Sequence, residues 1–217
     1  MPERTKNLKE PARKSRKPLE SPRLTRDDWL DAAFLAVVEG GFDKARVLTI
    51  ADALGVTRGS FYWHFTDHAD LLAALLARWK EREIELDKSL RPDVSKDPVV
   101  ELERLLEKAL AHAGTDLENM RFELALRGLG RRDADVAAML VEVDRARMRL
   151  FEYKFQRLTG SSQKATELAA LFYLAIVGSY QALSRPSSSH EVKEFLMGVI
   201  ANYLIHQQAP VAAPKRR

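Results

Sequence analysis

Apolar residues recur at three- and four-residue intervals along most of this 217-residue chain, which is the spacing of one face of an amphipathic helix. The first clear example runs through Leu30, Ala33, Phe34, Val37 and Val38. The sequence shows no sustained alternation of apolar and polar residues and no Asn-Gly or Asp-Gly pair of the kind that closes tight hairpins. The pattern therefore predicts an all-α fold.

Helix start and stop signals divide the chain into about nine helices. Thr25 and Asp28 have the spacing of an N-terminal cap, as do Asp67 and Asp70, and Gly55 follows the second helix as a C-terminal glycine does. The predicted helices span residues 25–39, 47–54, 57–64, 67–90, 98–113, 116–129, 134–158, 163–184 and 191–206.

The formal net charge is only +4, but it is unevenly distributed. Residues 1–26 hold nine basic and three acidic residues, and the chain ends on Lys215, Arg216 and Arg217, so the body is acidic. Four prolines and few large apolar residues predict a flexible arm over 1–24. Such an arm binds phosphates or enters a minor groove in some DNA-binding proteins. A solvated tail that only aids solubility has the same composition, and both interpretations stay open.

Several classes of site are not expected. The chain has no Cys, which excludes disulfides and thiolate chemistry. His64 and His68 have a ligand spacing, but the helix is expected to break between them, so we predict neither a metal nor a cofactor. No Gly-x-Ser-x-Gly, phosphate-loop or His-Glu-x-x-His motif is present, so we do not expect an enzyme. Without an apolar signal stretch in 1–26, and with the uncharged run 168–184 interpreted as a buried helix, we expect a cytoplasmic protein.

The most informative segment is 47–65, which reads VLTIADALGVTRGSFYWHF. Two short helices joined by Leu54, Gly55 and Val56 predict a helix-turn-helix, in which the glycine adopts the left-handed conformation at low cost. Phe61 and Phe65, four residues apart, are expected to face inward. The segment is therefore a candidate DNA-reading unit.

The remaining positions of the second short helix suit contact with DNA. Arg58 can form a bidentate pair with a guanine edge, and Thr57 and Ser60 can bond phosphates or bases. Tyr62 and Trp63 are stiff side chains with polar tips, which suits contact with DNA. The alternative is that they pack on the first or fourth helix. The predicted outward residues are Thr57, Arg58, Gly59, Ser60, Tyr62, Trp63 and His64.

Residues 29–76 resemble the DNA-binding domain of the TetR (tetracycline repressor) family of bacterial regulators. The resemblance rests on WLDAAFLAVVEGGF at 29–42, IADALGVTRGSFYWHF at 50–65 and DHADLLAALL at 67–76. It implies a three-helix DNA-binding domain at 25–70, joined through a fourth helix to a larger ligand-binding and dimerisation domain at 71–207, with a tail at 208–217. It also implies that Arg58 reads a base and that Gly59, Ser60, Tyr62, Trp63 and His64 contact DNA.

The segment departs from the family pattern in three places. Arg46 stands where the family often has a capping Thr, so it is expected to reach a phosphate without capping. Asp67 lies where a Lys is common, and Leu48 where a polar reader is common. We hypothesise that the basic arm compensates, so that removing residues 1–20 weakens DNA binding and flattens its salt dependence.

The resemblance further implies a homodimer and a small-molecule effector. Residues 168–183 and 192–204 carry small and apolar positions suited to a four-helix bundle between subunits, although they would also be explained by the subunit's own core. Arg121, Glu123 and Arg127 would either hold a polar group of the effector or be solvated or paired. Candidate pocket residues, each also explicable as core, are Met120, Phe122, Leu126, Met139, Phe151, Phe172 and Tyr173.

The sequence thus predicts a ligand-responsive transcriptional regulator, most simply a repressor, that binds a palindromic double-stranded DNA operator as a dimer. A ligand-independent architectural DNA-binding protein is the alternative, because it would use the same helices.

Overall fold

The computed structural model describes residues 24–91, 97–110, 115–184 and 190–208. Those residues form nine α-helices and no strand, which confirms the all-α prediction. Nearly all of the predicted arm and tail, together with Pro92, residues 111–113 and Pro186, lie outside the described residues.

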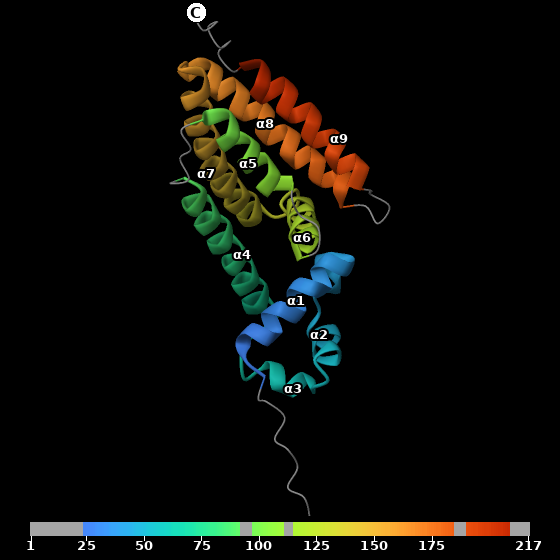
Figure 1. The fold of residues 1–217 in the computed structure, drawn as a ribbon. Helices are drawn as coiled ribbons and strands as arrows, with labels where there is room; N and C mark the ends of the chain where they lie inside the picture. Colours follow the sequence, from blue (N-terminus) through green and yellow to red (C-terminus); the bar gives the residue numbers. More distant parts are fainter. Residues whose placement is uncertain (1–23, 92–96, 111–114, 185–189, 209–217) are drawn as a thin grey trace, which may run out of the picture.

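The first three helices form one end of the molecule (Figure 1): α1 (Arg26–Gly40), α2 (Val47–Ala53) and α3 (Arg58–Phe61). Thr25 and Asp28 form the predicted capping box, with the Thr25 amide donating to the Asp28 carboxylate at 2.6 Å. Gly41 ends α1 at φ 76°, a conformation that a side chain would strain. Local sequence signals therefore fix both ends of α1.

The first core lies where these three helices meet α4 (His68–Leu90). Trp29 is completely buried and makes an edge contact with Phe61, with ring centroids 5.4 Å apart. Phe65 stacks on Phe61, as the four-residue spacing predicts. Asp67 caps α4 by accepting a hydrogen bond from the Asp70 amide at 2.9 Å.

The remaining helices form the larger part of the molecule. They are α5 (Pro98–Leu110), α6 (Thr115–Leu129), α7 (Ala134–Thr159), α8 (Ser162–Leu183) and α9 (His190–Ile200). Two predicted boundaries were wrong. The third helix ends at Phe61 because Tyr62–His64 form a turn, and the last helix gives way at Ala201 to a π-helical segment that ends at Ile205.

A second core joins α5, α7, α8 and α9 around Leu102, Phe155, Phe172 and Ile205, all essentially inaccessible. By length and composition alone, α8 is long and apolar enough to cross a membrane. In this fold it packs along α7 and contributes Phe172 to the second core.

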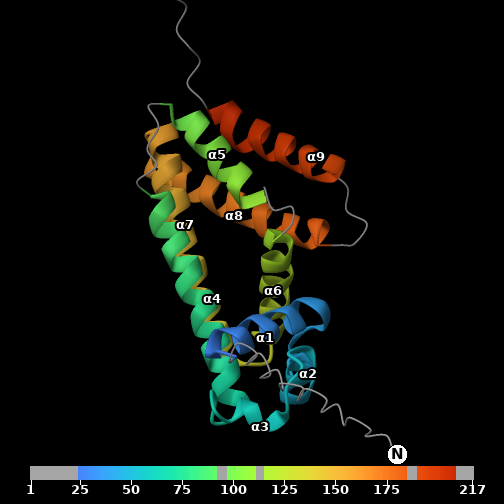
Figure 2. The ribbon, with the colours of Figure 1, turned by 60° about the horizontal axis from the view of Figure 1, so that its bottom comes forward.

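The two cores are bridged by α6, which lies between α1 and α8 (Figure 2). Phe122 stacks on Phe34 of α1 at 4.9 Å and lies 5.8 Å from the ring of Phe42. Leu126 and the first turns of α7 belong to the same cluster. The first core is consequently built from both of the predicted domains.

Candidate DNA-binding surface and internal pocket

The turn between α2 and α3 has the geometry of a helix-turn-helix. Gly55 adopts φ 67°, as predicted, and the Val56 amide donates to the Ala51 carbonyl at 3.0 Å. Thr57 begins α3 in an extended conformation, and its side chain makes no capping hydrogen bond. Its hydroxyl therefore remains available on the outer surface.

The side chains around α3 divide sharply between the core and the solvent. Phe61 and Phe65 are buried, whereas Tyr62 is 52% exposed and Trp63 is 80% exposed. The alternative that Trp63 packs on a neighbouring helix is therefore wrong, whereas about half of the Tyr62 side chain is covered. The apolar side chain of Leu48 is also exposed, on α2.

The residues predicted to touch DNA lie on α3, in the turns beside it and, for Arg46, directly before α2. Arg58 donates to the Tyr62 hydroxyl at 3.0 Å, and both side chains are exposed. Ser60 and His64 are half-buried. Arg46 is exposed and donates to the Asp43 carbonyl at 3.0 Å without capping α2, as the sequence predicts.

Gly59 lies on this surface without being required by the packing of the chain itself. A Cβ built at this position has only Thr57 Oγ1 within 4 Å, at an ordinary contact distance of 3.6 Å. The free space lies on the outer side of α3, where another molecule can approach the backbone closely.

The two nearby histidines are held apart by the fold. His68 Nε2 lies 2.6 Å from the Ala45 carbonyl oxygen, and the His64 ring packs 6.5 Å from Trp29. Across the described ranges, no three His, Asp or Glu side chains are grouped closely enough to hold a metal ion.

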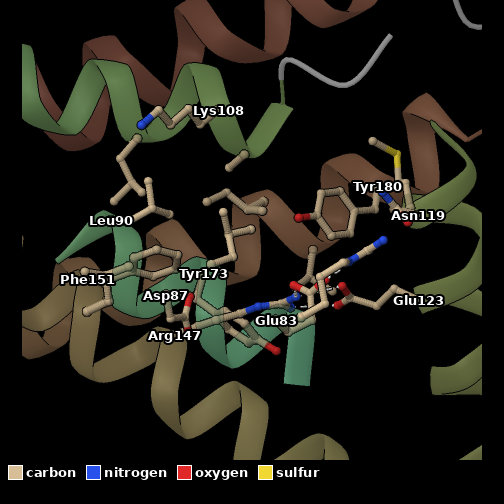
Figure 3. A pocket seen from close by; sticks show the side chains of 18 residues that line it. Glu83, Asp87, Leu90, Lys108, Asn119, Glu123, Arg147, Phe151, Tyr173 and Tyr180 are labelled. Carbon is tan, nitrogen blue, oxygen red and sulfur yellow. Dashed lines mark hydrogen bonds and ion pairs between the residues drawn. The ribbon is translucent and has the colours of Figure 1, made fainter. Parts of the chain in front are cut away.

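A second candidate site is a cavity of about 610 Å³ lined by residues of α4, α5, α6, α7 and α8 (Figure 3). Most of its wall is apolar. The principal apolar side chains are Leu86, Leu90, Leu105, Leu150, Phe151 and Ile176. Its size is that of a pocket for a drug-sized molecule.

Three of the seven predicted pocket residues, Met120, Phe151 and Tyr173, line this cavity. The other four do not. Phe122 and Leu126 face α1 within the first core, and Met139 packs against that core. Phe172 is held between Phe151 and Phe155, with ring centroids 5.1 and 5.4 Å away. Helical spacing alone did not distinguish the core-facing side of α6 and α8 from the cavity-facing side.

A buried ionic network forms one wall of the cavity. Arg147 of α7 donates to Glu83 of α4 at 2.6 Å and to Glu123 of α6 at 2.8 and 2.9 Å. Arg127 connects Glu123 to Asp144 with contacts of 2.7 Å each. The network ties α4, α6 and α7 together, and Figure 3 shows its central contacts.

Mutual neutralisation keeps Glu123 and Arg147 ionised. Burial favours the neutral form of Glu123, but Arg147 and Arg127 outweigh it, so the pKa of Glu123 lies below its ordinary value. Burial likewise opposes the charge on Arg147, yet Glu123 and Glu83 raise the pKa of that guanidinium well above its usual range. The sequence left three alternatives open for Glu123 and Arg127, in which they hold a polar group of the effector, are solvated or are paired; in the structure they are paired with each other.

Asp87 and Tyr180 are polar side chains of the cavity that lie outside this network. Asp87 Oδ2 is buried and has no hydrogen-bond partner among the described residues. Burial, offset in part by Arg147, raises the pKa of Asp87 to about 6. Burial also raises the pKa of Tyr180 well above its usual range, so its hydroxyl stays protonated. The sequence analysis had singled out neither residue.

A third surface is the outer side of α8 and α9, which lies at the opposite end of the molecule from α3 (Figure 1). Leu171, Leu174, Phe195 and Tyr203 are each more than half exposed there. Among the residues proposed for this face, Ala169 and Ile200 instead point into the subunit's own core.

Residues 30–75 match the family described as "Bacterial regulatory proteins, tetR family". The HTH-type transcriptional repressor BepR of Brucella suis is 30% identical over 168 residues, an alignment that covers 72% of this chain and 78% of BepR. The chain belongs to the TetR family. It is thus related to DNA-binding transcriptional regulators, and the resemblance noted from the sequence is confirmed.

Other TetR-family relatives match over shorter stretches. TtgR of Pseudomonas putida is 33% identical over 91 residues, which is 42% of this chain and 43% of TtgR, so the alignment spans less than half of that relative. The family match at 30–75 contains all of the predicted DNA-contacting residues and none of the cavity residues.

Solved structures support the fold over most of the chain. A transcriptional regulator from Rhodococcus sp. RHA1 superposes with a TM-score of 0.72 at 17% identity, covering 88% of this chain and 100% of that one. A putative transcriptional regulator from Saccharomonospora viridis, crystallised in complex with choline, gives 0.69 at 19% identity, with 83% and 95% coverage. The fold of these regulators therefore extends over most of this chain.

Proposed function

We propose that this TetR-family protein is a repressor that binds a palindromic operator as a dimer and is released by a small-molecule effector. The observation that carries the proposal is the outward cluster of Arg58, Tyr62 and Trp63 on a helix-turn-helix, in a molecule that also has a separate cavity. The repressor role draws on the name of BepR.

Dimerisation follows from the limited reach of one recognition helix. The single helix α3 spans only Arg58–Phe61 and reads too few bases for specific binding. Two subunits related by a two-fold axis place two such helices about 34–36 Å apart in successive major grooves. The exposed apolar face that includes Leu174 and Phe195 is the surface we assign to that contact.

Two helices connect the cavity with the DNA-binding end. Helix α4 begins at the Asp67 cap beside α3 and carries Glu83 and Asp87 to the cavity. Helix α6 presents Glu123 to the cavity and Phe122 to α1. An effector that fits one position of α4 and α6 better than another shifts the population between DNA-competent and DNA-incompetent dimers.

Two further parts of the proposal concern the effector and the cellular location. The choline complex of the Saccharomonospora regulator supports small-molecule binding by this fold. A regulator that acts on bacterial operators works in the cytoplasm, where its DNA is. We accordingly propose a non-enzymatic regulator in that compartment.

The decisive experiment is selection of bound duplexes from a random DNA pool by the full chain. We expect an inverted repeat whose half-sites lie about one helical turn apart. A featureless selection profile would overturn the proposed operator binding and favour the architectural alternative.

A further inference from the structure

The chemistry of the cavity wall indicates what kind of effector it accepts. Its cationic side chains are already engaged. Arg147 is neutralised by two carboxylates, Arg82 pairs with Glu83 at 3.3 Å, and Lys108 has an interaction of its own. The buried guanidinium of Arg147 therefore offers a bound anion no unbalanced positive charge.

The anionic side of the wall is different. Glu83 and Glu123 are satisfied by Arg147, but Asp87 Oδ2 is buried without a hydrogen-bond partner in the part of the chain that the structure describes. Leaving a buried carboxylate oxygen unpaired is costly, and an incoming positive charge removes that cost.

The rest of the wall suits a large apolar body that carries such a charge. Phe151, Tyr173 and Tyr180 surround the cavity and are labelled in Figure 3. Aromatic rings attract a desolvated cation through their faces, and they also bury hydrocarbon. The volume of about 610 Å³ admits a molecule of several rings.

We propose that the effector is a lipophilic monocation, an organic ammonium or a delocalised cation, whose positive charge lies at the carboxylate of Asp87. As an effector assignment this rests on the proposed function, although binding to the cavity does not require DNA. Asp87 lies one helical turn beyond Glu83 on α4, so the bound charge acts directly beside the ion pair that ties α4 to α7.

The binding should weaken as Asp87 is protonated. Because burial raises the pKa of Asp87 to about 6, the carboxylate is ionised at pH 8 and largely neutral near pH 5. The charged and titratable groups that face it or line the same cavity are Arg82, Glu83, Arg91, Lys108, Glu123, Arg147, Arg149, Tyr173 and Tyr180. Arg147 holds the pKa of Glu123 below its ordinary value, whereas the raised pKa of Asp87 lies within this range.

The test uses isothermal titration of the DNA-free full chain with three probes of similar shape. Tetraphenylphosphonium is cationic, tetraphenylborate is anionic and triphenylphosphine oxide is neutral. We expect the phosphonium to bind at least about tenfold more tightly than either of the others at pH 8, and to lose that advantage near pH 5.

Two variants sharpen the result. Asp87→Asn should weaken phosphonium binding by at least about tenfold and leave the neutral probe unchanged. Glu85→Gln removes an exposed carboxylate of the same helix and should change neither. Equal or tighter binding of tetraphenylborate by the parent chain, or phosphonium binding untouched by Asp87→Asn, overturns the inference. The comparison of the three probes uses the parent chain, so it tests the inference even if Asp87→Asn fails to fold. Because the titration contains no DNA, a failure to select an operator would not change the measured affinities of the probes.

Discussion

Arg58 and Tyr62 show what single residues contribute to the recognition surface. The sequence predicts that both side chains face outward, but it does not show that the guanidinium of Arg58 donates to the phenol of Tyr62 at 3.0 Å. That bond holds a long, flexible side chain close to one orientation before DNA is present. A base-reading arginine that is already oriented loses less conformational entropy on binding.

Gly59 gives a test of close approach to DNA. Because its added Cβ would make only an ordinary contact with Thr57, Gly59→Ala should fold normally, with stability unchanged or raised by about 0.5–1 kcal/mol. Binding to the selected operator should nevertheless weaken, since the methyl group occupies the space between α3 and the duplex. Thermal unfolding and fluorescence anisotropy measure the two effects, and unimpaired DNA binding would show that the backbone does not approach the DNA here.

Asp87 gives a test of buried charge in the absence of any effector. Its pKa is raised from 3.8 to about 6, so the folded state binds a proton more tightly than the unfolded state does. The cost of ionising it is fully present above about pH 6 and vanishes below about pH 4. Asp87→Asn should therefore be more stable than the parent at pH 8, on the order of 1–2 kcal/mol after allowance for partial exposure.

Urea unfolding at several pH values measures that difference. We expect the advantage of Asp87→Asn to shrink as the pH falls from 6 towards 4. An advantage that is constant over this range would mean that Asp87 has an ordinary pKa.

At the scale of elements, sequence reasoning succeeded where the determinant is local. The capping box at Thr25, the cap at Asp67 and the left-handed Gly55 each depend on residues within four positions, and all three were predicted. The direction of Phe122 was not predicted. Helical spacing shows that a residue lies on the apolar face of its helix. Whether Phe122 faces α1 or the cavity depends on how α6 crosses its neighbours.

The ionic network was missed for the same physical reason. Arg147 meets Glu83 and Glu123, which lie 64 and 24 residues away in the sequence. No local spacing connects them. Glu83 follows Trp79 by four residues and therefore lies on the same buried face of α4. A charged residue on a buried face needs a partner of opposite charge, and this was the one sign of the network in the sequence.

Arg147 should be essential for the joining of α4, α6 and α7. Arg147→Met leaves Glu83 and Glu123 buried without their principal cation, so we expect a loss of about 3–5 kcal/mol in the free energy of unfolding. Arg145→Met, an exposed position on the same helix, is the matched control and should change stability little. Chemical denaturation compares them, and equal stability of the two variants would contradict a structural role for the network.

At the scale of the whole molecule, the recognition helix and the proposed dimer face lie at opposite ends (Figure 1). A dimer formed through α8 and α9 would therefore leave both α3 helices free for DNA. The positions of the exposed residues on α8 and α9 could be predicted only in part, because Ala169 and Ile200 proved to serve the subunit's own core.

Dimerisation can be broken without disturbing that core. Leu174 is 64% exposed, so Leu174→Glu should fold but sediment as a monomer and lose operator binding. Val141→Glu, an exposed apolar position on α7, should remain dimeric. Sedimentation velocity distinguishes these outcomes, and a dimeric Leu174→Glu would place the interface elsewhere.

The most direct measurement is equilibrium binding of the full chain to its selected duplex by fluorescence anisotropy, at physiological salt and with random duplex as competitor. We predict two chains per duplex and a clear preference over the competitor. Arg58→Ala should cost about 1–3 kcal/mol and relax the choice of one base pair in each half-site. A monomer that binds random and selected duplexes equally, or an Arg58→Ala variant with unchanged affinity and preference, would contradict the account.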